Sequence, residues 1–261
     1  MTVDSDQVDR SHVISELGLA VQLDGDGLRG NAVVVPEMHV PGTDVLRVSV
    51  LAAWADVLTG LLSGTALAPR VPVTLDLSID LPRVLRGTPS VAGAARILKA
   101  GRSVVVLEVS FVEEEDRRPV ALGTASFMPS PDTSLTLPAL RDSPSILERS
   151  PDRLTAPFAE RADCVRRGDG VAELPRREDA LNASNTINGG LIALLMEESA
   201  LSTAPDSVLS SLALRYLRPA RVGPLVATAT RHGDVVVVAA HDTGADDRLV
   251  AAATARLTPA C

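Results

Sequence analysis

The sequence predicts an α+β protein in which one unit, made of a strand, a long helix and an antiparallel meander, occurs twice. Two observations carry this prediction. Segments of matching pattern recur in the same order in both halves of the 261-residue chain, and each half has one long apolar helical segment ahead of its strands. A chain of this length can form two domains of ordinary size or bury one large core.

The final strands of the two halves match best. Residues 120–129 (VALGTASFMP) and 250–259 (VAAATARLTP) are identical at five of ten positions. Residues 75–82 (LDLSIDLP) also match 212–219 (LALRYLRP), and both segments alternate and end at a proline. Such runs between glycine or acidic turns predict antiparallel strands joined by hairpins. Unrelated meanders share this pattern, but the common order of segments favours a duplication.

Each half is expected to contain one long helix. The first runs from about Val45 to Leu62 with Asp44 as its cap, and the second opens at Asn188 and continues to about Ser202. Both segments are apolar nearly all round, which is typical of a helix wrapped by a sheet.

The repeat also predicts the domain boundaries. We expect an N-terminal half at residues 1–129, a linker rich in proline, serine and aspartate at 130–151, and a C-terminal half at 152–261. A further strand is expected before each helix, at residues 30–35 and 170–174.

Composition narrows the class of protein. Hydrophobic residues make up 46% of the chain and charged residues 22%, as in globular proteins, and the net charge of −8 argues against nucleic acid or an anionic membrane as partner. The N-terminus lacks a signal-peptide pattern, and the apolar stretch 48–62 is interrupted and too short to span a bilayer. Cys164 and Cys261 form no ligand spacing, which favours a reducing cytoplasm over a disulfide.

The order of strand, buried helix and curled meander resembles the hotdog superfamily, here in a double-hotdog form. Residues 216–223 (YLRPARVG) are typical of its acyl-CoA thioesterase branch, which includes the 4-hydroxybenzoyl-CoA thioesterase type. The resemblance covers nearly the whole chain. It implies hydrolysis of acyl-CoA or an acyl-carrier thioester in fatty acid metabolism, with no cofactor besides the coenzyme A of the substrate. It also implies that two double units can pair as a homodimer.

Thioester hydrolysis requires donors at the carbonyl oxygen, a positioned water, and a carboxylate that activates this water or attacks directly. Asn188, Gly189 and Gly190 at a helix start offer unpaired backbone N–H groups and close approach, although they also serve as a plain helix cap. In the thioesterases that this segment resembles, the first position is usually His, with an Asn six residues earlier and an acid nine residues later. Here these positions hold Asn188, Asn182 and Glu197.

Helix geometry separates the two acids. The nine residues from Asn188 to Glu197, at roughly 100° each and about 900° in all, place Glu197 on the face opposite to Asn188 at the helix start. The acid that faces Gly189 must therefore come from the other half. The matching position there is Asp56, a carboxylate in an otherwise apolar helix, which is costly unless paired or useful. Thr74 stands where the related family commonly places a hydroxyl that holds the water.

The reciprocal site, which would combine Glu197 of the second half with the helix start of the first half, lacks suitable groups. Pro41, Arg47 and Val48 occupy the first-half positions that match Asn182, Asn188 and Gly189. We expect Arg47 to neutralise Glu197, so that one site works and the other is degenerate. Glu197 stays a candidate second acid, but pairing or solvation is the favoured role for Glu197 and Glu198.

Four arginines, Arg83, Arg86, Arg218 and Arg221, follow matching strands of the two halves. They are candidate contacts for the phosphates of coenzyme A, although for each arginine taken singly the role of an ordinary solvated turn residue is favoured. The four histidines are scattered, so no metal site is expected. A hydratase on a similar fold would need a histidine near the helix, and none lies there, which disfavours that activity. A catalytically inactive acyl-binding or scaffold protein is the alternative that stays open.

Overall fold

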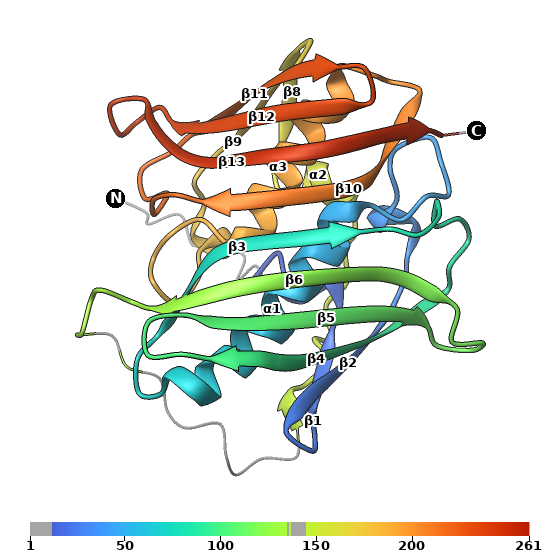
Figure 1. Cartoon of the computed structure of the whole chain (residues 1–261). Helices are drawn as coiled ribbons and strands as arrows, with labels where there is room; N and C mark the ends of the chain where they lie inside the picture. The colour runs from blue at the N-terminus through green and yellow to red at the C-terminus, as the bar shows by residue number, and fades with distance from the viewer. Residues whose placement is uncertain (1–11, 135, 137–144, 261) are drawn as a thin grey trace, which may run out of the picture.

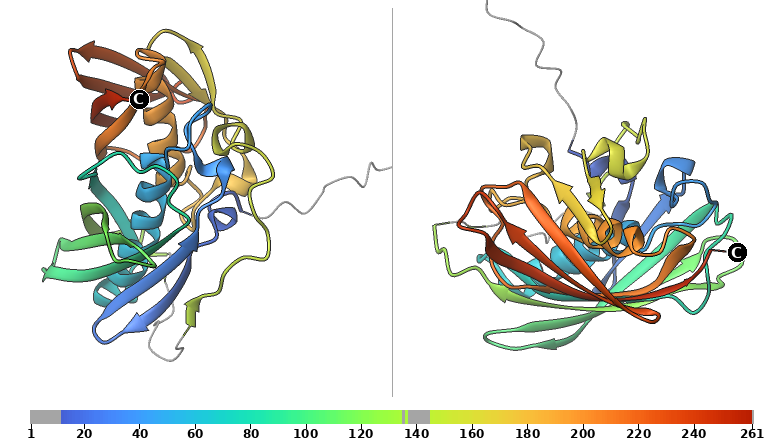
Figure 2. Two further views of the ribbon diagram at one scale, coloured as in Figure 1. Left: turned by 90° about the vertical axis from the view of Figure 1, so that its right-hand side faces the viewer. Right: turned by 90° about the horizontal axis from the view of Figure 1, so that it is seen from above.

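A computed structural model describes residues 12–134, 136 and 145–260. One antiparallel sheet of 13 strands forms one layer of the molecule, and two long helices lie behind it (Figure 1). Seen from above, the sheet curls around the helices, which occupy its concave side (Figure 2). The N-terminal segment and Cys261, on which the expectations about a leader and a disulfide depend, lie outside the described residues.

The first half contains a hairpin, a long helix and four antiparallel strands, in that order along the chain. Its elements are β1 (Ala20–Asp24), β2 (Gly27–Val33), α1 (Val48–Leu67), β3 (Pro72–Asp80), β4 (Ser90–Ala100), β5 (Val105–Glu113) and β6 (Pro119–Pro129). Strands β4, β5 and β6 form a meander, and β3 pairs with β6. The helix and the strands were predicted, but the expected hairpin between the first two strands after the helix was wrong, because β3 lies beside β6 and not beside β4. Strand β1, the outer partner of β2, was not predicted.

The second half repeats this order. Its elements are α2 (Phe158–Arg161), β8 (Val165–Gly168), β9 (Val171–Leu174), α3 (Gly189–Ser202), β10 (Ser207–Tyr216), β11 (Leu225–His232), β12 (Val235–Asp242) and β13 (Arg248–Pro259). Strand β7 (Ser145–Leu147), which falls in the expected linker, pairs with β1 and so forms part of the sheet. Residues 135 and 137–144 of that linker lie outside the described residues.

The two halves join edge to edge through β3 and β10, in the order β7-β1-β2-β4-β5-β6-β3-β10-β13-β12-β11-β9-β8. The pairing is antiparallel, with Asp76 opposite Arg215 and Asp80 opposite Ser211. The start of β3 therefore lies at the same end of the sheet as the end of β10. Thr74 and Tyr216, although from different halves, come to that shared end.

Helix α1 is a core helix. With 20 residues it is long and apolar enough to cross a membrane by length and composition, but 67% of its most apolar window is buried inside the molecule. The expectation that this stretch is too short was wrong, because the helix continues to Leu67. Its Trp54 ring lies 6.5 Å from that of Phe111 on β5, and Trp54 Nε1 donates to the Leu17 carbonyl at 3.2 Å.

The two helices begin in different ways. Asn188 caps α3 as expected, since its Oδ1 accepts a hydrogen bond from the Gly190 amide at 2.8 Å. No side chain caps α1, which starts after Arg47. The predicted cap, Asp44, lies too early in the chain and instead pairs with Arg86 at 2.8 Å. The N–H groups in the first turn of α1 therefore need acceptors other than a capping side chain.

The helices touch where the first turn of α3 meets the middle of α1. A Cβ atom added to Gly190 would lie only 2.7 Å from Ala53 Cβ and 3.0 Å from Ala53 Cα. Any side chain at position 190 would separate the helices. This contact sets the amino end of one helix beside the middle of the other, which is the arrangement that a shared site requires.

Candidate active site

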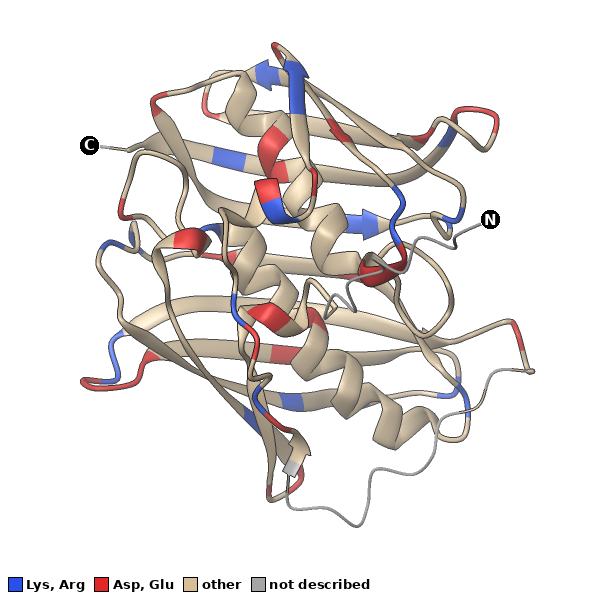
Figure 3. Ribbon diagram, turned by 180° about the vertical axis from the view of Figure 1, so that it is seen from behind, with Lys and Arg blue, Asp and Glu red and all other residues tan. Residues whose placement is uncertain are grey.

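Asp56 is the one charged residue within the sequence of α1. Viewed from behind, the two helices are largely uncharged, with a few acidic positions (Figure 3). Thr74 Oγ1 donates a hydrogen bond to Asp56 Oδ1 at 3.0 Å. A β-bulge between Thr74 and Asp76 shifts the alternation of β3 at this point, which lets Thr74 face the helix. The acid and hydroxyl that the sequence placed together are therefore in contact.

The environment of Asp56 makes it a stronger base than an ordinary carboxylate. Burial raises its pKa to about 6, and the hydrogen bond from Thr74 opposes this shift. At neutral pH the carboxylate is mostly ionised yet retains high proton affinity. A pKa near the working pH suits general-base chemistry.

Gly189 faces Asp56 across the junction between the halves. A Cβ atom at Gly189 would lie 2.9 Å from Asp56 Oδ2, so a side chain at this position would displace the carboxylate. Gly189 is the first residue of α3, and the N–H groups of a first helical turn have no intrahelical acceptor. The prediction that Asp56 of one half faces the helix start of the other half is confirmed.

Tyr216 is a member of this group that the sequence prediction missed. Its hydroxyl donates to the Gly189 carbonyl at 3.0 Å and lies 3.3 Å from where a Gly189 Cβ would stand. Burial, together with the nearby Asp56 carboxylate, raises the pKa of Tyr216 well above its usual value, so the hydroxyl stays protonated. One signal was available: this is the single tyrosine of the chain, and it opens the YLRPARVG segment.

A cavity of about 320 Å³ opens beside Asp56 and Thr74. Asn182 lies in its wall, as predicted, but its Oδ1 accepts from the amides of Ser184 and Thr186 at 2.9 and 3.2 Å and so shapes its own loop. The cavity is lined by residues of both halves: Asp56, Gly60, Leu61, Gly64, Val71, Pro72, Thr74, Phe127, Asn182, Ala183 and Ser184.

Two predicted roles are corrected. Gly190 was expected to contact substrate, but it is buried against Ala53 and its N–H is taken up by Asn188 Oδ1. The oxygen of Asn188 is thereby used as a helix cap, which leaves the Gly189 amide as the donor of this turn.

The reciprocal position is filled by protein. Glu197 Oε1 accepts from the Val48 amide at 3.0 Å, and Oε2 accepts from Ser49 Oγ at 2.5 Å and from Arg47 Nη1 at 3.2 Å. The Arg47 and Glu197 side chains are both 0% exposed. The expected neutralisation of Glu197 by Arg47 is confirmed. The Glu197 carboxylate occupies the start of α1, whereas its counterpart Asp56 leaves the start of α3 open.

Glu198 completes this buried cluster. It pairs with Arg47 at 2.6 Å and with Arg166 at 2.6 Å. Two carboxylates and two guanidinium groups thus balance in charge. Cys164, a buried thiol, lies near enough that Glu198 contributes to raising its pKa, though burial is the main cause.

The four arginines divide between the two ends of the β3–β10 pair. Arg83 pairs with Glu113 at 2.6 Å and Arg86 with Asp44 at 2.8 Å, so both are neutralised at the end away from Thr74. The prediction that Arg83 contacts substrate is wrong for this reason. Arg218 and Arg221 follow β10 at the end that holds Thr74, and both are exposed. Arg218 Nη1 donates to the Leu249 carbonyl at 3.1 Å.

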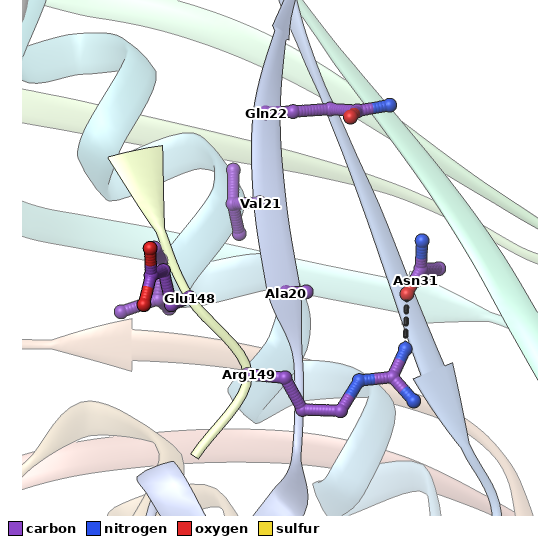
Figure 4. A pocket seen from close by; sticks show the side chains of 7 residues that line it. Ala20, Val21, Gln22, Asn31, Glu148 and Arg149 are labelled. Carbon is purple, nitrogen blue, oxygen red and sulfur yellow. Dashed lines mark hydrogen bonds between the residues drawn. The ribbon is translucent and has the colours of Figure 1, made fainter. Parts of the chain in front are cut away.

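A second hollow, of about 370 Å³, lies at the edge formed by β1, β2 and β7. Its wall includes Gln22, Asn31, Glu148 and Arg149, and the guanidinium of Arg149 donates to Asn31 (Figure 4). It shares no residue with the group around Asp56. Within the part of the chain that the structure describes, no three His, Cys, Asp or Glu side chains lie close enough to hold a metal ion.

Comparison with protein families supports the resemblance seen in the sequence. The family model of the thioesterase superfamily matches residues 49–120, a segment that includes Asp56 and Thr74. The predicted resemblance to the hotdog thioesterase superfamily is thereby confirmed. No curated protein matches this chain.

Solved structures share the fold over nearly the whole chain. The 12:0-ACP thioesterase from Umbellularia californica aligns with a TM-score of 0.64 and 15% identity, covering 91% of this chain and 99% of that one. An acyl-ACP thioesterase from Bacteroides thetaiotaomicron gives 0.61 and 12%, covering 89% and 98%. The tesB protein of Mycobacterium avium subs paratuberculosis gives 0.61 and 14%, covering 95% and 98%. At these identities the likeness establishes a hotdog fold, with its long helix and antiparallel sheet.

Stability should depend on pH through Asp56. Its pKa of about 6 in the folded state exceeds the value of about 3.9 in an unfolded chain. Between these values the folded state binds a proton that the unfolded state does not, so the free energy of unfolding falls as pH rises through this window. We expect Asp56→Asn to be at least as stable as wild type at pH 8 and to lose about half of this advantage by pH 5. Urea unfolding at both pH values tests this, with the exposed Asp26→Asn as control.

Removal of Arg47 should be strongly destabilising. Arg47→Met leaves Glu197 and Glu198 buried without their shared cation, and breaking a buried pair in this way costs about 3–5 kcal/mol. Arg96→Met, which removes an exposed partner of Glu108, should have a much smaller effect, because solvent screens this pair. Similar losses for both variants in urea unfolding would contradict the role assigned to the buried cluster.

Proposed function

We propose that this protein is a double hotdog that hydrolyses acyl thioesters at a single site between its halves. The observation that carries this proposal is the Asp56 carboxylate, held by Thr74 and set against Gly189 at the start of the opposite helix. The match of residues 49–120 to the thioesterase superfamily supports thioester hydrolase activity. In this proposal, residues 1–129 and 152–261 are the two hotdog halves and 130–151 connects them.

The mechanism follows from the three groups. A water held between Thr74 and Asp56 loses a proton to the Asp56 carboxylate while its oxygen bonds to the thioester carbon. The carbonyl oxygen becomes an oxyanion that accepts from the Gly189 amide, aided by the positive end of the helix dipole. Collapse of this intermediate breaks the C–S bond, and the proton on Asp56 goes to the departing thiolate. The products are a carboxylic acid and a thiol.

Direct attack by Asp56 on the thioester carbon is the second route open to this geometry. Asp56 Oδ1 is bound to Thr74, whereas Oδ2 points to Gly189 and is the oxygen positioned to attack. This attack breaks the C–S bond, releases the thiolate and forms a mixed anhydride, which water then hydrolyses to the free acid and Asp56. Incorporation of ¹⁸O into Asp56 during a single turnover in H₂¹⁸O would establish direct attack, because general-base catalysis leaves both carboxylate oxygens in place.

The charged end of the substrate fits the exposed Arg218 and Arg221, at the end of β10 beside the site. Phosphates of coenzyme A or of a carrier-bound pantetheine are the anions that such guanidinium groups bind. We further propose that the reaction takes place in the cytoplasm, requires no cofactor besides coenzyme A as part of the substrate, and is carried out by a homodimer of double-hotdog units.

Replacement of Asp56 should abolish turnover without loss of the fold. We expect Asp56→Asn to lower kcat by roughly 10²–10⁴-fold, the usual contribution of a positioned base. In wild type, kcat/KM should fall below about pH 6 as Asp56 becomes protonated. Thiol release from a panel of acyl-CoAs measures both effects, with Asp26→Asn as control. If wild type binds acyl-CoA but hydrolyses none, the chain is an acyl-binding protein; if Asp56→Asn keeps full activity, the site assignment is wrong.

Tyr216 should contribute through the position of Gly189. Tyr216→Phe removes one hydrogen bond to the Gly189 carbonyl, a change of about 1 kcal/mol, or roughly fivefold in kcat, with KM little changed. The acid limb of the pH profile should persist, because Asp56 is retained. An unchanged kcat would show that Tyr216 only fills space.

A further inference from the structure

The cavity beside Asp56 continues along one face of α1. Asp56, Gly60 and Gly64 are spaced four residues apart and so lie one above another on the same face of the helix. All three line the cavity. After Asp56, the next two positions on this face are Gly60 and Gly64, which carry no side chain.

Glycine is among the least favourable residues in a helix interior, so two glycines on one helical face need a reason. A Cβ atom at Gly60 would stand 3.7 Å from the Phe127 ring, an ordinary contact distance, so a side chain larger than methyl would extend into the cavity that both residues line. In α3 the residue four positions after Glu197 is Leu201, which is 1% exposed. The second helix also ends at Ser202, while α1 continues to Leu67. The bare face is therefore particular to the half that supplies Asp56.

The wall of this groove is apolar away from the acid. Leu61, Val71, Pro72 and Phe127 complete it, while the polar lining consists of Asp56, Thr74, Asn182 and Ser184. Val71 follows the end of α1 closely and so lies toward the Gly64 end. A pantetheine arm would bring two amide groups that need hydrogen-bond partners, which the walls of Gly60 and Gly64 do not offer. An alkyl chain needs none.

Resting on the proposed function, we propose that this groove binds the acyl chain, that its length selects medium-chain aliphatic thioesters, and that Gly60 and Phe127 determine this specificity. Eight residues separate Asp56 from Gly64, which is about 12 Å along the helix. Carbon–carbon bonds of about 1.5 Å advance an extended chain by about 1.25 Å per carbon, so the groove accommodates roughly eight to ten carbons. The cavity of about 320 Å³ also lies near the lower end of ligand pockets, roughly 300–1,000 Å³.

The test fills the groove at its middle. Gly60→Leu places an isobutyl group against Phe127, between the acid and the Gly64 end. For this variant we expect kcat/KM for octanoyl- and decanoyl-CoA to fall at least about tenfold, while that for acetyl-CoA stays within about twofold, because only longer chains reach position 60. Phe127→Leu should shift the preferred chain to longer acyl groups. Ala66→Leu adds the same bulk to an exposed position of α1 and should change neither.

A binding measurement keeps this proposal separate from the proposed function. Non-hydrolysable S-alkyl-CoA thioethers of two to sixteen carbons are titrated calorimetrically into wild type and into each variant, with thermal unfolding as a check of the fold. In wild type, affinity should rise with chain length up to about ten carbons. Loss of this dependence in Gly60→Leu supports binding of the acyl chain in the groove even if no thioester is hydrolysed. An equal loss of affinity for every chain length, the two-carbon thioether included, would place pantetheine in the groove and overturn the proposal. An unchanged chain-length profile in Gly60→Leu would also overturn it.

Discussion

The close contact between the first turn of α3 and the middle of α1 is the constraint on which the candidate site depends. Gly190 lies against Ala53 with no room for a side chain, and the antiparallel β3–β10 pair holds the halves in this relation. The same crossing places the carboxylate at the middle of each helix against the amino end of the other. Both pairs use the affinity of a helix start for negative charge. What differs is how far each carboxylate reaches.

Glu197 is one methylene longer than its counterpart Asp56, and it reaches the helix start directly. It accepts from Val48, Ser49 and Arg47, so the amide donors of α1 are saturated within the protein. Asp56 is instead held at Oδ1 by Thr74, and Oδ2 stops at the surface of Gly189. The space and the unpaired amide of that helix start are left for a ligand. One end of the helix pair is a buried ionic contact, while the other has a base of raised pKa beside a cavity.

The difference between the two ends also accounts for the location of the ion pairs. The buried Arg47 cluster joins the two helices at the closed end, and there Arg83 and Arg86 are paired with Glu113 and Asp44. Buried ion pairs contribute less to stability than their geometry suggests, but they strongly disfavour arrangements that leave either partner alone. The closed end therefore fixes how α1 lies against α3. That same alignment sets the distance between Asp56 and Gly189 at the open end.

Local sequence patterns were enough to predict the repeated order of elements, the two core helices, the acid isolated on an apolar helix, and the glycine at the start of the other helix. These features depend on local periodicity, on the polarity of single positions and on the angle between residues of one helix, so they can be read without knowledge of the neighbours. Which groups meet across the halves became clear from the three-dimensional arrangement alone. It brought Tyr216 to Gly189, turned Thr74 toward Asp56 through a bulge, assigned Gly190 to helix packing, and neutralised Arg83 with Glu113. Each of these depends on strand register and helix crossing between residues far apart in the chain, and such pairings leave no pattern in the local sequence.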